Sequence, residues 1–247
     1  MVIKMTAQNI FDDPIFFDGY KKIRDNPDNL NIHLEKPALF AMLPDLHGKS
    51  VLDLGCGFGE NCTEFLNRGA CGVIGVDISK KMLEVAKSQT SGIEFICADM
   101  NELSGIAGKY DVVCSSLAVH YVADFNKFCC EVRDLLNTGG YFIFSQESPL
   151  NTARCNSNDL PRWTRDENDK KLFYNLKDYD RVGYVEEKWI VDKVIKYHRR
   201  YCDIVNALSK AGFIIEMMDE PVGGGKANND GEGAHFPYFL LVKARKI

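Results

Sequence analysis

The sequence has no long hydrophobic run, no basic stripe and no cysteines at metal-ligand spacing. No apolar stretch approaches the 18 residues that suggest a membrane-spanning helix, and the start Met-Val-Ile-Lys-Met does not resemble a secretory signal. The 30 basic and 35 acidic side chains give a net charge of −5 without a cationic track. We therefore expect no nucleic-acid partner and no membrane association, because both call for clustered positive charge or apolar length.

The nine cysteines are odd in number and scattered, mostly through apolar segments such as those of Cys97 and Cys114. Cys129 and Cys130 are adjacent and lack the spacing of metal ligands. We expect reduced cysteines, a cytoplasmic protein and no bound metal. The length of 247 residues is ample for one α/β domain with an appended lid, as a monomer or homodimer.

The segment 51–59, Val-Leu-Asp-Leu-Gly-Cys-Gly-Phe-Gly, is the most informative part of the chain. An apolar strand, a glycine turn and a helix over residues 61–66 form the place where an open α/β sheet binds a nucleotide-like ligand. Glycine suits this loop because the turn needs positive φ and because a β-carbon would hold the ligand off the backbone. We predict that the ligand lies on Gly55, Cys56 and Gly57, next to Asp53.

This loop differs from the dinucleotide-binding fingerprint. The fingerprint requires a third glycine at position 60, where the chain has Glu60. An acidic residue inside the loop would repel a pyrophosphate and would suit a ligand with an ammonium or a sulfonium. An NAD-type oxidoreductase of the same topology remains an alternative, which the glycine spacing disfavours.

The same nine residues closely resemble motif I of the class I S-adenosylmethionine (SAM)-dependent methyltransferases, and the resemblance continues over roughly residues 48–146. It implies SAM as the cofactor and S-adenosylhomocysteine as the product. The pair His198-Arg199, which precedes a predicted helix over 201–211, resembles a small-molecule branch of the family, similar to the type 11 methyltransferases of ubiquinone and menaquinone biosynthesis.

Two further apolar runs end in a carboxylate. Asp77 lies 20 residues past Gly57, the spacing at which an acidic residue meets a ribose diol, although it could instead cap the helix over 79–89. The run 93–100 contains Asp99, which by resemblance accepts from the adenine amino group while Met100 or Ala98 covers the ring. The alternative for Asp99 is an exposed loop carboxylate. The resemblance adds two more cofactor-binding residues, Ile78 and Ser115.

Strands and helices alternate along the chain. Strands are expected over 110–117, 138–145, from 212 and over 236–244, with a helix over 125–137. Because the first five strands are continuous apolar runs, they should be buried on both faces of a parallel sheet. The predicted fold class is α/β, with a Rossmann-like, doubly wound, seven-stranded and mostly parallel sheet whose seventh strand is antiparallel.

The chain divides into four predicted parts within a single domain. Residues 48–146 are the SAM-binding core, and residues 201–247 add the last helix and a strand hairpin. Residues 1–47 are a helical flap with an amphipathic helix over 31–43. By analogy Phe17, Tyr20 and Arg24 touch the methionine end of SAM, with Arg24 pairing its carboxylate. The alternative is a packed N-terminal helix.

Residues 147–200 are predicted to form a substrate cap. The segment is rich in aromatic side chains, which supply contact area for a planar or apolar ligand, and 182–185 with 188–197 reads as a hairpin. The same residues would also build a small satellite core. The glycine-rich stretch 223–231 reads as a loop.

The sequence says least about the methyl acceptor and the residues that bind it. A base is needed only when the acceptor loses a proton, and His120 and His198 are the catalytic candidates because histidine titrates near neutrality. Residues 115–118, Ser-Ser-Leu-Ala, lack the Asn-Pro-Pro-Tyr pattern of DNA amino methylases. We predict methyl transfer from SAM to the O, N or C atom of a small molecule, with a non-catalytic SAM-binding protein as the other possibility.

Overall fold

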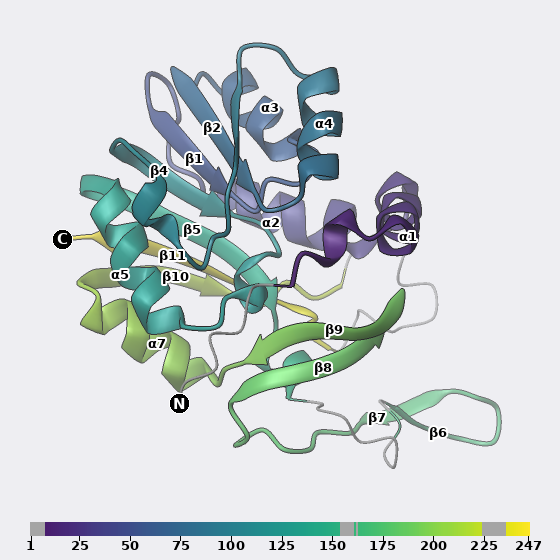
Figure 1. Cartoon of the computed structure of the whole chain (residues 1–247). Coiled ribbons are helices and arrows are strands. Elements are labelled where there is room, and N and C mark those ends of the chain that lie inside the picture. The colour runs from purple at the N-terminus through teal and green to yellow at the C-terminus, as the bar shows by residue number, and fades with distance from the viewer. Residues whose placement is uncertain (1–7, 154–160, 162, 224–235) are drawn as a thin grey trace, which may run out of the picture.

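A computed structural model of the chain describes residues 8–153, 161, 163–223 and 236–247. Its centre is a seven-stranded sheet in the order β10-β11-β5-β4-β1-β2-β3 (Figure 1). Only β11 runs antiparallel to its neighbours, β5 and β10, so the predicted fold class is confirmed. The strands are β1 (Ser50–Leu54), β2 (Gly72–Asp77), β3 (Glu94–Cys97), β4 (Tyr110–Ser115), β5 (Leu136–Glu147), β10 (Phe213–Asp219) and β11 (Phe239–Lys246).

Helices cover both faces of this sheet. One apolar core joins the sheet to α5 and α7, and a second core joins it to α2, α3 and α4. The strands β1 and β4 are almost entirely buried, as expected for parallel strands packed on both sides. The helices of these layers are α2 (Lys36–Met42), α3 (Glu60–Asn67), α4 (Lys80–Gln89), α5 (Phe125–Leu135) and α7 (Tyr201–Lys210), with short 3-10 turns η3 (Leu103–Gly105) and η4 (Val119–Tyr121).

Some element boundaries differ from the sequence prediction. The helix expected to reach residue 137 ends at Leu135, because Leu136 already pairs with Tyr110 of β4. The seventh strand begins at residue 239 rather than 236. Part of the predicted loop over 223–231, residues 224–231, lies outside the described residues.

The N-terminal segment forms two helical pieces beside the sheet. It comprises η1 (Ile10–Asp12), α1 (Pro14–Asp25), a π-helical turn η2 (Asn31–Glu35) and then α2. Asp13 caps α1 by accepting from the Phe16 amide. The helix predicted over 31–43 therefore begins with a π turn, and both Asn31 and Glu35 on this turn are buried.

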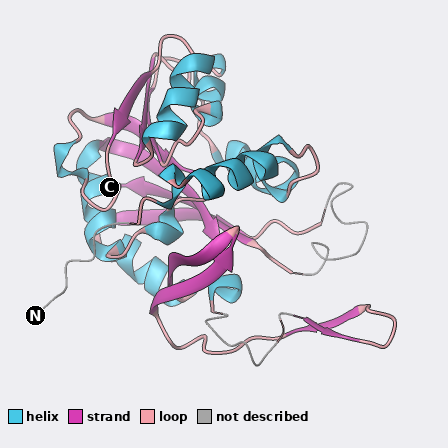
Figure 2. Ribbon diagram, turned by 45° about the vertical axis from the view of Figure 1, so that its right-hand side comes forward, coloured by secondary structure: helices cyan, strands magenta, loops and turns pink. Residues whose placement is uncertain are grey.

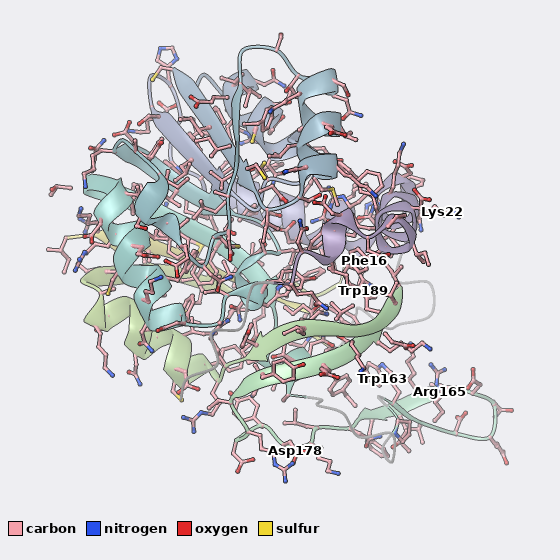
Figure 3. All side chains as sticks on the ribbon, viewed as in Figure 1. Phe16, Lys22, Trp163, Arg165, Asp178 and Trp189 are labelled. Carbon is pink, nitrogen blue, oxygen red and sulfur yellow. The ribbon has the colours of Figure 1, made fainter. Side chains whose placement is uncertain are left out.

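The segment between β5 and α7 contains the predicted hairpin, formed by β8 (Gly183–Trp189) and β9 (Val191–His198). A second hairpin, β6 (Trp163–Arg165) with β7 (Lys171–Tyr174), was not predicted and projects away from the body (Figures 1 and 2). A short helix α6 (Pro149–Thr152) follows β5. At the tip of the β8–β9 hairpin, Trp189 packs edge-to-face on Phe16 of α1, with ring centroids 5.3 Å apart (Figure 3). The N-terminal segment and the hairpin therefore meet over the same end of the sheet.

Candidate functional site

A cavity of about 630 Å³ lies at the carboxyl ends of β1, β2, β3 and β4. This volume is within the range of small-ligand sites, roughly 300–1,000 Å³. Its wall combines the glycine loop, the acidic strand ends, the turn after β4, the N-terminal segment and β9. The topology therefore brings segments from positions 8 to 197 of the chain around one space, as expected for the ligand-binding edge of an open α/β sheet.

Gly55, Gly57 and Gly59 all have positive φ, between 52° and 77°. A β-carbon on Gly55 would lie 2.4 Å from the Ala118 β-carbon, so this position requires glycine. A β-carbon on Gly57 would meet nothing within 4 Å and would instead project into open space on the cavity wall. The loop thus leaves room for a ligand to approach its backbone.

Asp77 lines the cavity and also holds the glycine loop. Its Oδ2 accepts from the Gly57 amide and its Oδ1 from the Ser79 amide, both at 2.9 Å. Burial raises the pKa of Asp77, opposed by these two hydrogen bonds. The helix cap itself is Ser79, whose hydroxyl accepts from the Met82 amide. Because a carboxylate can accept about four hydrogen bonds, Asp77 keeps capacity for ligand hydroxyls.

Asp99 lines the same cavity, beside Ala98 and Met100. Its Oδ1 accepts from both the backbone and the side-chain amide of Asn101, at 2.9 Å each. Ile78 completes this part of the wall. Seven predicted cofactor residues therefore line the cavity: Tyr20, Gly55, Gly57, Asp77, Ile78, Asp99 and Met100.

Three other predicted cofactor residues lie behind the wall rather than on it. Asp53 is 1 % exposed, accepts from the Cys62 thiol at 3.3 Å, and has a pKa raised by burial to about 7. The Ser115 hydroxyl donates to the Leu54 carbonyl at 2.7 Å and so ties β4 to β1. Cys56 is also buried and does not line the cavity.

Glu60 and Arg24 are found in a different arrangement from the one predicted. Glu60 binds Arg24, with a nitrogen–oxygen distance of 2.5 Å, and also binds Lys36. Arg24 donates in addition to Asn31. The interpretation of Glu60 as a carboxylate for a cationic ligand is therefore corrected, because two protein cations already neutralise it. Arg24 does not line the cavity, and its guanidinium ties α1 to Glu60, the first residue of α3.

Aromatic side chains form the far end of the cavity, and one of them, Tyr20, is a predicted cofactor-binding residue. Phe11 packs edge-to-face on Tyr20 and Tyr121, with ring centroids 5.5 and 5.7 Å apart, and all three line the cavity with Tyr197. Gln8 closes this end because its side chain exchanges hydrogen bonds with the backbone of β9, at 2.8 and 2.9 Å. The aromatic residues of segments 1–47 and 147–200 were the sequence signal for this part of the site. That the two segments meet at the cavity depends on the tertiary fold.

The charges on the cavity wall are mostly negative. Among the residues that the structure describes, four carboxylates contribute to the lining, and Lys127 is the one cation there. Lys127 is itself paired with Glu102 at 2.8 Å and with Glu131 at 3.5 Å. Such a wall favours a ligand with positive charge over a polyanion. The four carboxylates are Asp77, Asp99, Glu102 and Asp124.

Known proteins match this chain in sequence and in structure. Residues 52–144 match the family described as "Methyltransferase domain". The crystal structure of a SAM-dependent methyltransferase from Mesorhizobium loti is 34 % identical, over 86 % of this chain and 97 % of that one, with a TM-score of 0.74. The chain belongs to the class I SAM-dependent methyltransferases.

Relatives of this methyltransferase differ in what is known of them. An uncharacterised protein from Haemophilus influenzae is 36 % identical over 97 % of each chain. A ubiquinone biosynthesis O-methyltransferase from Coxiella burnetii is 31 % identical, but over 121 residues only, 46 % of this chain and 51 % of that protein. The shared region therefore supports the SAM-dependent reaction and leaves the acceptor to be argued from the site.

The cofactor of this methyltransferase is SAM, and the cavity fits it. The open cradle at Gly57, the spare accepting capacity of Asp77 and the negative wall all suit a sulfonium-bearing nucleoside. The predicted NAD alternative receives no support from the family assignment. In the described part of the chain, no helix is long and apolar enough to cross a membrane. Nor do its histidine, cysteine and acidic residues form a group that could hold a metal.

Neither histidine predicted as catalytic lines the cavity of the methyltransferase. His120 is buried and its Nδ1 accepts from the Glu147 amide at 3.3 Å. His198 uses both ring nitrogens, Nδ1 with the Thr152 hydroxyl at 2.8 Å and Nε2 with the Tyr179 carbonyl at 3.0 Å. Burial lowers the pKa of both rings, His120 well below its usual value. The structure thus places the two rings in the packing around the cap.

Proposed function

We propose that this methyltransferase transfers the methyl group of SAM to a small molecule held between the N-terminal segment and β9. One observation carries the proposal: a single cavity extends from the acidic strand ends at Asp77 and Asp99 to the aromatic side chains of Phe11, Tyr121 and Tyr197. Its first part suits the nucleoside, and its second part offers an aromatic surface for an acceptor. We assign the ribose to Asp77 and the adenine edge to Asp99 as part of this proposal.

When bound, SAM supplies an electrophilic methyl group, so the chain's main tasks are alignment and exclusion of water. Gln8, with its two hydrogen bonds to β9, closes the cavity beside Phe11. Tyr20 and Tyr121 line the cavity, and neither hydroxyl has a hydrogen-bond partner among the residues that the structure describes. Burial raises the pKa of both phenols, so at neutral pH each can donate a hydrogen bond to an acceptor.

One relative and the charge of the site support a small acceptor over a polymer. The matched Coxiella burnetii protein is named for O-methylation in ubiquinone biosynthesis. The acidic cavity wall and the net charge of −5 disfavour a nucleic acid. An uncharged or cationic small molecule with an apolar body agrees with both observations.

Tritium transfer from methyl-labelled SAM tests the proposal. The full-length protein is incubated separately with a low-molecular-mass metabolite extract, total RNA and a protein lysate, and the label is then traced. We expect label in the small-molecule fraction. Label confined to RNA or protein would refute a small acceptor, and SAM binding without transfer to any fraction would identify a SAM-binding protein that lacks methyl-transfer activity. His120→Gln and His198→Gln, assayed on the labelled fraction, then test the two histidines as bases.

A further inference from the structure

The turn after β4 has an unusual backbone conformation. Ser116, Leu117 and Ala118 all line the cavity, and Leu117 has a φ of +50°. Positive φ is uncommon for residues other than glycine, and a bulky leucine rarely adopts it. Ala118 packs directly on Gly55 of the glycine loop. The conformation of Leu117 therefore shapes the cavity wall next to the cofactor loop.

Hydrogen bonds from the Leu117 amide to Ser145 of β5 hold this conformation. The Leu117 amide donates to the Ser145 hydroxyl at 2.9 Å and to the Ser145 carbonyl at 3.1 Å. The Ser145 hydroxyl donates its own proton onward to Oε1 of Glu35. The Ser116 hydroxyl donates to the same oxygen at 2.8 Å. Glu35 is thus the common acceptor for both sides of the turn.

Glu35 comes from a distant part of the chain. It is fully buried and lies on the π-helical turn η2, 81 residues before Ser116 and 110 before Ser145. Its second oxygen accepts from Asn31 at 2.5 Å. These three donors stabilise the carboxylate form of Glu35 and oppose burial, which raises the pKa of this carboxyl group. Burial of a carboxylate is unfavourable unless its hydrogen bonds are made. The hydrogen bonds that offset this penalty at Glu35 also fix the turn.

We propose that Glu35 is a positioning residue of the SAM site, which holds Ser116 and Leu117 in the conformation that binds the cofactor. It acts through the two serines and does not itself line the cavity. The proposal depends on the SAM site and is independent of the identity of the acceptor. π-Helical turns recur at functional sites, and this one directs a carboxylate from the N-terminal segment into the core.

Calorimetric titration with S-adenosylhomocysteine tests the proposal without an acceptor. We expect Glu35→Ala to weaken binding about tenfold or more, because both serine donors lose their acceptor. Glu35→Gln, which keeps a carbonyl oxygen for the two serines, should lose less than about threefold. Ser50→Ala is the matched control, since its hydroxyl also donates to a carboxylate, Asp111, at 3.0 Å at the opposite end of β1.

A double-mutant cycle with Leu117→Gly separates positioning from a general loss of structure. Glycine adopts positive φ without strain, so the conformation of the turn should depend less on the hydrogen bonds to Glu35 in this variant. We expect Glu35→Ala to cost several-fold less affinity in the Leu117→Gly background than in the wild type. Should Glu35→Ala not fold, Ser145→Ala takes its place in the cycle. An equal loss in both backgrounds, or wild-type affinity in Glu35→Ala or Ser145→Ala, would overturn the proposal.

Discussion

Asp77 and Gly57 are joined by a hydrogen bond of 2.9 Å from the backbone amide of the glycine to a carboxylate oxygen. The end of β2 therefore fixes the loop that follows β1 from a distance of 20 residues in the chain. The same carboxylate is the one expected to meet the ribose. Binding and preorganisation of the loop thus depend on one side chain, so its removal should affect both.

The first prediction concerns this carboxylate. Asp77→Ala should weaken SAM binding at least about tenfold, since hydrogen bonds to a charged group contribute roughly 1.5–3 kcal/mol. Isothermal titration measures the change. Asp111→Ala is the control, because Asp111 also accepts from a backbone amide, that of Ser50, but at the far end of the sheet. Equal affinities of Asp77→Ala and wild type would place the ribose elsewhere.

The second prediction concerns the space above the loop. Gly57→Val should weaken SAM binding more than Asp77→Ala, because a β-branched side chain would enter the cavity and disfavour the φ of +52°. Gly92→Val is matched in backbone strain, with φ +76° and nothing within 4 Å, but lies away from the cavity. Both variants should lose stability to urea, and only Gly57→Val should lose SAM affinity. Equal SAM affinities in the two variants would contradict the placement.

The third prediction is a pH dependence of stability. Burial raises the pKa of Asp53 to about 7, above its unfolded value of about 3.9, so the folded state holds the proton more tightly. Its contribution to stability is therefore fully present below about pH 4 and is lost as the pH rises toward 7. Compared with Asp53→Asn, the wild type should lose free energy of unfolding between about pH 5 and pH 8. Urea titrations of both proteins at both pH values test the sign, and a relative gain by the wild type would refute it.

The fourth prediction concerns the attachment of the β8–β9 hairpin. Lys196 is almost fully buried and binds Glu147 at 2.5 Å and Glu187 at 2.8 Å. Lys196→Met should cost roughly 3 kcal/mol of unfolding free energy, because it leaves partly buried carboxylates without their cation. Lys188→Met, on the same hairpin, breaks an exposed pair with Asp192 and should cost less than about 1 kcal/mol. Similar losses in the two variants would show that the buried pair does not hold the hairpin.

Much of the cofactor side could be predicted from the sequence, because its determinants are local. A strand, a glycine turn and a helix are contiguous, and Asp77 and Asp99 each end the apolar run that carries them. Parallel strands bring such ends to one edge, so the residues Gly57, Asp77 and Asp99 met as expected. The alternation of apolar runs and helices predicted a mostly parallel sheet, whereas the order of its seven strands came only from the structure.

Only the tertiary structure decided which side chains face the cavity and which face the protein. Glu60 and Arg24 form an ion pair. Both ring nitrogens of His198 form hydrogen bonds, one with Thr152 and one with Tyr179, because packing brings these partners within hydrogen-bond distance. Glu35 gave no local signal, since its partners lie 81 and 110 residues away. The spacing of apolar residues along the chain shows which face of a helix or strand is buried. Which polar groups pair between different elements depends instead on how those elements pack together, and the sequence alone does not show this.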